Sequence, residues 1–292
     1  MKQLLLLFVF LFSIVGIKGQ NLPIGWEELT APDFKKAVEL SEGVCVIPMG
    51  VVEKHGPHLP LGTDVYTARE VSKRAASKEY CIVYPYYFVG QIFEAQQQPG
   101  TIAYSSELIY KMLDETCREI SRNGIKKIIL MNSHGGNTTF LQYFCQTQLD
   151  KPKDYVVYLF TPSVDAETQK KISSMRKSTT GGHADEVESS SMMAIRPDLV
   201  KINQATSEPG VDMNRLQQKN VYTGIWWYAK YPNHYAGDSK DANAELGEIS
   251  LEQRGQQLAE VIKMVKADQQ TLKLQNEFFK ETLSPLNTPI RR

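Results

Sequence analysis

The sequence predicts an α/β protein with a mainly parallel central sheet that is covered by helices on both faces. Three short apolar runs have the length and composition of buried strands: 44–49, 127–132 and 154–160. Three segments with helical spacing of apolar residues alternate with them: 63–77, 105–124 and 137–149. Alternation at this spacing is typical of parallel sheets, because their crossover connections run over the two faces.

In chain order, the strand at 44–49 leads through a loop into a helix from about Thr63 to Ser77. The segment 81–90, CIVYPYYFVG, predicts a second strand, with Pro85 arguing against one uninterrupted central strand. The final third is less regular. It contains an aromatic, loop-like segment at 220–248 and a long helix from about 244 to 270.

The helix at 105–124 has serine at its start and Gly124 at its end. Its apolar positions lie near one face, which indicates an amphipathic helix: Leu108, Ile109, Met112, Leu113 and Ile120.

The composition is that of a globular protein. The 292 residues are 42% hydrophobic and 23% charged, with a formal net charge of zero. Without a basic excess, the chain does not predict a nucleic-acid or polyanion-binding surface. No linker and no internal repeat divides it, so we expect one domain over 20–275 and a C-terminal surface extension at 276–292.

Residues 1–19 predict a secretory signal peptide. Lys2 precedes an apolar run from Leu4 to Ile17, and the small residue Gly19 stands near its end. The run is short for a membrane span, although an N-terminal membrane anchor is the alternative. We therefore expect an exported protein, periplasmic or secreted, that has no membrane association once the signal is removed.

Four cysteines are scattered without the C-x-x-C spacing of zinc or redox motifs: Cys45, Cys81, Cys117 and Cys145. Export would permit disulfides, so their redox state stays open. Cys45 and Cys81 lie in apolar runs and are interpreted as small buried hydrophobic residues.

Four of the five histidines lie in three short segments rich in glycine and carboxylates: EKHGPHLPLGTD at 53–64, NSHGGN at 132–137 and GGHADEVESS at 181–190. The first two segments follow predicted strands, which places them at the same edge of a parallel sheet. A single histidine in a loop is more often structural. Four histidines in segments rich in glycine and carboxylates favour a transition-metal site, since imidazole and carboxylate are its usual ligands.

Glu53 and His55 are two residues apart, so at an extended strand end their side chains point to the same side. Asp64 follows a turn rich in glycine and proline that can fold it back towards them. A carboxylate that is reached from two sides is what a bridging ligand in a two-metal site requires.

These blocks resemble the creatininase (creatinine amidohydrolase) family. MGVVEKHGPHLPLGTD, NSHGGN and GGHADEVESS occur in the family's order, and AGDSKDANAELGE is similar to a later stretch. The resemblance spans roughly 25–270. It implies a three-layer α/β/α sandwich with two divalent metal ions per chain (zinc, manganese or iron). The implied reaction is hydrolysis of a C–N bond in a small cyclic amide or formamide, by a homo-oligomer that is often a hexamer.

Carried over residue by residue, the resemblance implies that Glu53 and His134 bind one metal. His55 would bind the other, and Asp64 would bridge the two. Family members specific for creatinine carry a glutamate for the second metal at the position of Gly136. In members with the H-G-G-N block, the glutamate that corresponds to Glu188 serves instead.

His183 is the implied acid/base or substrate-polarising residue, and Glu188 joins it in the catalytic set. Two divalent cations would lower the pKa of a bridging water so that hydroxide attacks the carbonyl carbon. His183 would deliver a proton to the leaving nitrogen. Gly136 makes creatinine a doubtful substrate, as do Ala95 and Gln98, which stand where many members have histidine and phenylalanine.

Two alternatives remain: a peptidase-like or ester-cleaving enzyme on the same scaffold, and a non-catalytic exported protein that binds metal. His58 is expected to orient the loop as a neighbour of the ligands or to be structural. Asn137 is expected to begin a helix within its motif. Trp226 and Trp227 are expected to line a substrate pocket or to mediate subunit packing. The role of His234 stays open.

Asp185 and Glu186 are interpreted as solvated charges at a helix start, where the helix dipole stabilises them.

Overall fold

The computed structural model describes residues 22–291. Its centre is a four-stranded sheet in the order β2-β1-β3-β4, and every pairing is parallel. The strands are β1 (Val44–Met49), β2 (Ile82–Val83), β3 (Lys127–Asn132) and β4 (Val156–Phe160). β1 pairs with β3 along its whole length, from Val44 opposite Lys127 to Met49 opposite Asn132. The two strands therefore end side by side.

Side chains of β1 alternate between two separate cores. Cys45 and Ile47 face one core, and Val44 and Val46 face the other. The first core is closed by α1 (Ala31–Leu40), α3 (Ser106–Arg122) and α4 (Asn137–Thr147). The second is closed by α2 (Thr63–Lys78) and α8 (Ala244–Ala267). A strand buried on both faces is apolar throughout, as this one is.

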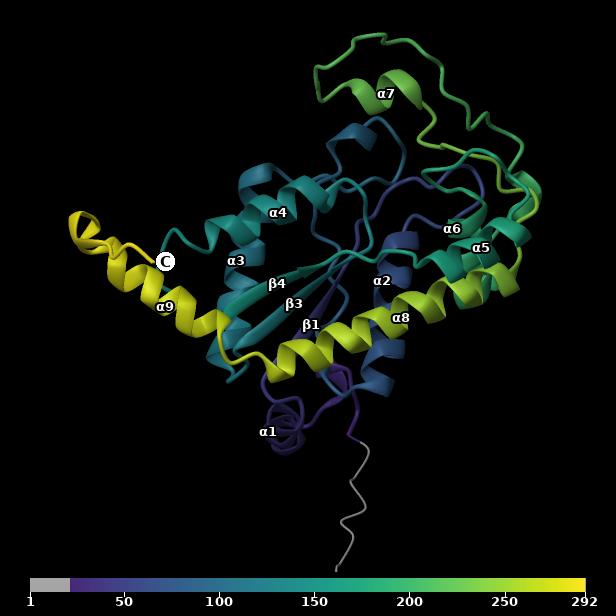
Figure 1. Ribbon diagram of the computed structural model, residues 1–292. Coiled ribbons are helices and arrows are strands. Elements are labelled where there is room, and N and C mark those ends of the chain that lie inside the picture. Colours follow the sequence, from purple (N-terminus) through teal and green to yellow (C-terminus); the bar gives the residue numbers. More distant parts are fainter. Residues whose placement is uncertain (1–21, 292) are drawn as a thin grey trace, which may run out of the picture.

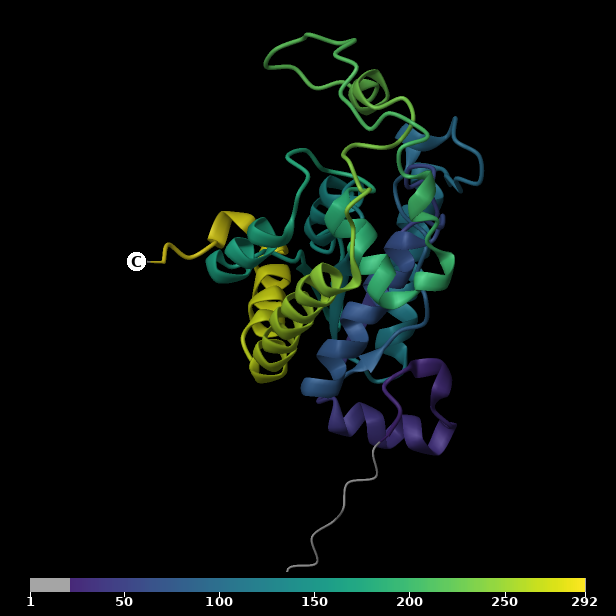
Figure 2. The same cartoon turned by 90° about the vertical axis from the view of Figure 1, so that its right-hand side faces the viewer.

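Figure 1 shows α3 and α4 on one side of the strands and α2 and α8 on the other, which confirms the predicted three-layer α/β/α fold. α5 (Ala166–Met175) and α6 (Glu186–Ile195) pack against α8. α7 (Trp226–Lys230) stands on a segment that extends away from the sheet in both views (Figures 1 and 2). Short 3₁₀ helices complete the described chain: η1 (Trp26–Glu28), η2 (Phe93–Ala95), η3 (Pro197–Leu199), η4 (Ile202–Gln204) and η5 (Pro285–Asn287).

The second strand is shorter than expected, and α3 buries only part of its apolar stripe. The strand expected over 81–90 is reduced to Ile82–Val83, since Pro85 interrupts it as its missing N–H requires. In α3 the buried residues include Ile109, Leu113 and Ile120, whereas Leu108 and Met112 are 41% and 39% exposed. The face of α3 that covers the sheet is therefore narrower than the apolar stripe.

The C-terminal part continues as helix. α8 ends at Ala267, and α9 (Thr271–Thr282) follows it, so the expected boundary between 275 and 276 falls inside a helix. The predicted signal peptide at 1–19 lies outside the described residues. Within 22–291, no helix has both the length and the apolar character that a membrane crossing requires.

All four cysteines are free thiols in the described chain. Cys45, Cys81 and Cys117 are buried, and burial raises the pKa of the Cys81 thiol to about 12. The structure thus agrees with the interpretation of Cys45 and Cys81 as small core residues.

Candidate metal centre

Loops at the carboxyl ends of β1 and β3 bring three predicted ligands together. Glu53 and His55 follow β1, and His134 follows β3 by two residues. Asp64 lies in the first turn of α2, whose backbone packs on Gly50. A Cβ at Gly50 would lie 2.6 Å from the carbonyl carbon of Asp64, so glycine is required for this close approach.

The carboxylate of Asp64 faces two imidazoles, one with each oxygen. Oδ1 lies 3.2 Å from Nε2 of His55, and Oδ2 lies 3.0 Å from Nδ1 of His134. Oε1 of Glu53 is 2.7 Å from the same His134 nitrogen. This is the arrangement of a bridging carboxylate between two sets of ligand atoms.

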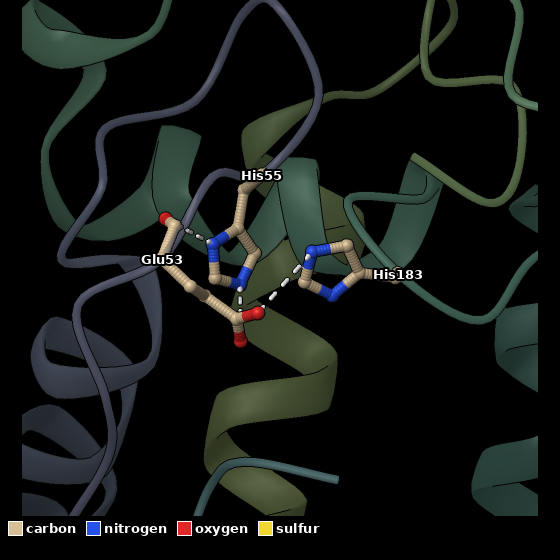
Figure 3. A group of neighbouring side chains, drawn as sticks. All are labelled: Glu53, His55 and His183. Carbon is tan, nitrogen blue, oxygen red and sulfur yellow. Dashed lines mark hydrogen bonds and ion pairs between the residues drawn. The ribbon is translucent and has the colours of Figure 1, made fainter. Parts of the chain in front are cut away.

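Three overlapping groups of side chains have ligand atoms within 4.8 Å of one another: Glu53, Asp64 and His134; His55, Asp64 and Glu188; Glu53, His55 and His183. The first two groups share Asp64 and contain all five side chains that the sequence resemblance implies as ligands. The third group makes His183 an alternative ligand. Figure 3 shows its three side chains converging, with the His183 ring beside that of His55.

The carboxylates fit a divalent cation. Glu53 and Asp64 are buried, yet Oε1 of Glu53 and Oδ2 of Asp64 accept no well-aligned hydrogen bond. Burial of two neighbouring carboxylates costs several kcal/mol, which a bound cation offsets. His134 donates Nε2–H to the carbonyl of Gln91 at 2.9 Å, which leaves Nδ1 free to ligate.

The charges of these buried side chains influence one another. Burial would raise the pKa of Glu53, but the neighbouring imidazoles, His134 first, hold it well below its ordinary value. Burial would lower the pKa of His134, but Glu53 and Asp64 raise it well above its ordinary value. Burial would also lower the pKa of His55, but Asp64 raises it to about 10. The imidazolium charges compensate the carboxylates in the same way that cations would.

Glu188 lies in the first turn of α6, and His183 precedes the cap of this helix. Asp185 caps this helix by accepting from the backbone N–H groups of Val187 and Glu188, at 3.0 Å each. Burial raises the pKa of Glu188 to about 7. Burial, with the nearby charge of His55, lowers the pKa of His183 to about 3, so its ring is neutral.

Contacts to two other segments hold His183 in place. Its Nε2–H donates to the carbonyl of Lys54 at 2.8 Å. Its backbone N–H and C=O pair with Ala236 at 3.1 and 3.0 Å. The ring lies 3.9 Å from Oε2 of Glu53, measured from Nε2 (Figure 3).

His234 is a member of the centre that sequence reasoning missed. Its Nε2 hydrogen-bonds to Oε2 of Glu53, and its ring is 4.4 Å from that of His183 between centroids. The sequence showed only that His234 lies in an aromatic, loop-like segment. Nothing in that segment indicated which side chain His234 would contact.

The remaining predicted residues surround the centre. His58 lies outside the ligand groups, with Nε2 2.7 Å from Oγ of Ser189 on α6. Asn137 begins α4 and accepts from the N–H of Gln91 at 2.9 Å. Trp227 contacts His183 edge-on at 5.9 Å between ring centroids, whereas Trp226 is 37% exposed.

The interpretation of Glu186 as a solvated charge was wrong. Its side chain is fully buried and accepts from the N–H groups of Lys177 and Ser178. Asp185 does serve at the helix start, but as the cap.

His58 is expected to reduce stability in mild acid. Burial lowers its pKa from 6.5 to about 4, so between these values the unfolded chain takes up a proton and the folded chain does not. Full stability is therefore present above pH 6.5 and falls towards pH 4, by at most about 3 kcal/mol from this group. Urea unfolding of the metal-free protein from pH 4 to 7.5 should show a shallower acid decline in His58→Gln than in wild type. Equal slopes would contradict this assignment.

The chain is similar to known proteins of one family. The creatininase family model, described as creatinine amidohydrolase, matches residues 27–262. Creatinine amidohydrolase of Pseudomonas putida is 25% identical over 252 residues, which are 81% of this chain and 95% of that protein. A mycofactocin precursor peptide peptidase of Mycobacterium tuberculosis (strain CDC 1551 / Oshkosh) is 32% identical over 102 residues, 32% of this chain and 40% of that protein.

Solved creatininase structures have the same fold. A mutant described as a Zn-Zn type superposes with a TM-score of 0.72 and 22% identity, covering 85% of this chain and 100% of that chain. A manganese creatininase has a TM-score of 0.71 and 21% identity with the same coverage. The family model spans most of the chain. The chain therefore belongs to the creatininase family of metal-dependent amidohydrolases.

Proposed function

We propose that this protein hydrolyses a C–N bond in a small cyclic amide or formamide-like substrate, with hydroxide shared by two divalent metal ions. The observation that carries the proposal is the pair of ligand groups that share Asp64. Glu53, Asp64 and His134 would hold one ion. His55, Asp64 and Glu188 would hold the other. Two such ions, when bound, supply hydroxide near neutral pH and polarise the carbonyl.

The protein's own residues supply proton transfer and position. Because Nε2–H of His183 is bound to the carbonyl of Lys54, the neutral ring keeps Nδ1 as the atom that accepts a proton. Nδ1 would take a proton from the attacking water and would pass it to the leaving nitrogen as the C–N bond breaks. The buried position of Glu53 and His55 keeps bulk water away from the ligand atoms.

Creatinine is not the substrate that we propose. Gly136 lacks the side chain that supplies a metal ligand in creatinine-specific members, and a side chain there would meet three neighbouring side chains closely. A Cβ there would lie 2.5 Å from both Oε1 of Gln91 and Nε2 of His134, and 2.8 Å from Oε1 of Glu94. Substitution by glutamate at 136 would therefore require Gln91, Glu94 and the proposed ligand His134 to shift.

A peptide is the second candidate substrate. The mycobacterial relative is named a precursor peptide peptidase, and its 32% identity over 102 residues exceeds that of the full-length relative over its own match. The same hydroxide chemistry cleaves a linear amide. A non-catalytic role is disfavoured, because both ligand groups are complete.

Metal titration tests the proposal. Metal-free protein titrated with Zn²⁺, Mn²⁺ or Fe²⁺ is expected to bind about two ions per chain. The loaded protein is then assayed on lactams, formamides and short peptides. Tight binding of fewer than about one ion per chain, or no hydrolysis of any class with any metal, would overturn it.

We propose export as well, on the basis of the apolar run from Leu4 to Ile17. The N-terminus of protein recovered from outside the cytoplasm is expected to follow Gly19. Recovery of full-length protein in the membrane fraction would favour the anchor instead.

We also propose self-association, up to a hexamer, on the basis of apolar side chains that the segment around α7 leaves exposed: Val211, Met213, Val221, Tyr222, Ile225, Trp226 and Tyr228. Light scattering on the purified protein tests it, and a monomeric mass would exclude it.

A further inference from the structure

Glu53 has two oxygens with different surroundings. Oε1 faces His134 and the predicted metal position. Oε2 is turned the other way, where Nε2 of His234 hydrogen-bonds to it. His234 is 2% exposed, and the residues are 181 positions apart in the chain. The contact therefore ties the end of β1 to the segment that follows α7.

Trp227 determines which nitrogen of His234 carries the proton. The indole Nε1–H donates to Nδ1 of His234 at 3.0 Å. An indole N–H is only a donor, so Nδ1 must accept. In the neutral ring the proton then sits on Nε2, where it is donated to Oε2 of Glu53.

The backbone of His234 has an unusual conformation. His234 has a φ of +53°, in the left-handed region that residues other than glycine seldom adopt. Its N–H donates to Tyr231 at 2.9 Å, and its carbonyl accepts from Gly56 at 3.2 Å. Gly56 stands next to His55, so the loop that bears the ligands and the segment that bears His234 are joined twice.

We propose that His234 is a positioning residue that orients Glu53 for metal binding, and that Trp227 fixes the tautomer it needs. The inference rests on the proposed metal centre. By binding Oε2, His234 directs Oε1 towards the ion held with Asp64 and His134. Without it, Oε2 would be a buried acceptor with no partner, and the carboxylate would turn to satisfy it.

His234 acts here through Glu53 and not as a ligand. Among the described residues it belongs to none of the groups whose ligand atoms converge. A purely structural role would predict that its loss lowers the melting temperature of the metal-free protein and leaves metal affinity unchanged. Metal affinity therefore separates the two roles.

The test uses four variants of the full chain: His234→Ala, His234→Gln, Trp227→Phe and, as matched control, Trp226→Phe. Isothermal titration of metal-free protein with Mn²⁺ and with Zn²⁺ gives the affinity of each binding step. The melting temperature of each metal-free variant is measured in parallel.

His234→Ala is expected to weaken the step that involves Glu53 by roughly 10- to 100-fold, and to spare the other step. His234→Gln should recover part of the affinity, because its amide N–H can reach the carboxylate. Trp227→Phe keeps an aromatic ring but loses the indole N–H, so a weakening of about three- to tenfold is expected. Trp226→Phe should bind metal like wild type.

Unchanged affinity in His234→Ala and Trp227→Phe, with metal binding by wild type intact, would overturn this inference alone. If His234→Ala does not fold, Trp227→Phe decides the question. Equal weakening of both steps would also overturn it, because only one step uses Glu53. Absence of divalent metal binding in wild type would overturn the proposed function and this inference together.

Discussion

Replacement of Asp64 by asparagine is expected to abolish hydrolysis and to remove tight binding of the second metal ion. Asp64 is the one side chain common to both proposed ligand sets, with Oδ1 facing His55 and Oδ2 facing His134. Asparagine has the same size but turns one oxygen into an N–H donor that cannot ligate. Loss of an indirect partner of a metal ligand already costs 10- to 100-fold, so we expect a loss of more than roughly 100-fold here.

The measurements are metal content per chain and turnover of the best substrate from the screen. The control is Glu70→Gln, which removes a carboxylate from the same helix where it pairs with Arg74 on the outer side. The control should keep both ions. If Asp64→Asn retains two ions per chain and wild-type turnover, the shared-ligand arrangement is wrong.

Replacement of His183 by glutamine is expected to lower kcat by roughly 10²- to 10⁴-fold, the usual contribution of one acid/base group. Metal content should stay at the wild-type value, because Glu53 and His55 each belong to a ligand group that does not include His183. Glutamine keeps an N–H for the carbonyl of Lys54, so the local backbone is preserved.

Metal analysis gives this variant a second use. Loss of an ion in His183→Gln would show that His183 binds metal through the third group, with Glu53 and His55. His58→Gln is the matched control, since it also removes a buried imidazole near the centre but lies outside the ligand groups. It is expected to retain both metal and kcat.

The layers of the fold could be predicted from the sequence because their signals are local. β1 and β3 are continuous apolar runs, and α2 and α4 have bounds within one or two residues of those expected. The exposed sides of Leu108 and Met112 could not be predicted in this way. Which part of an apolar stripe is buried depends on where the sheet lies against the helix.

The extent of the second strand could not be predicted from local sequence either. The apolar composition of 81–90 favours a strand, but only Ile82–Val83 pairs as one. Beyond Pro85 the chain returns as a single bridge between Met49 and Tyr87, with the N–H of Gly50 donating to the carbonyl of Tyr87 at 3.1 Å. Long-range contact, and not local composition, decides how this segment ends.

By itself the sequence determined the family, the three-layer fold and the three segments that bear Glu53, His134 and Glu188. The segments with Glu53 and His134 follow neighbouring strands, and parallel strands end at one edge, so these two segments must meet there. The family and the role of the Glu188 segment were predicted from the resemblance of the motifs. Only the tertiary structure decided that His234 contacts Glu53, that Glu186 is buried and that the surroundings of Gly136 are filled. These features arise between segments far apart in the chain, where no periodicity or spacing records which side chains will meet.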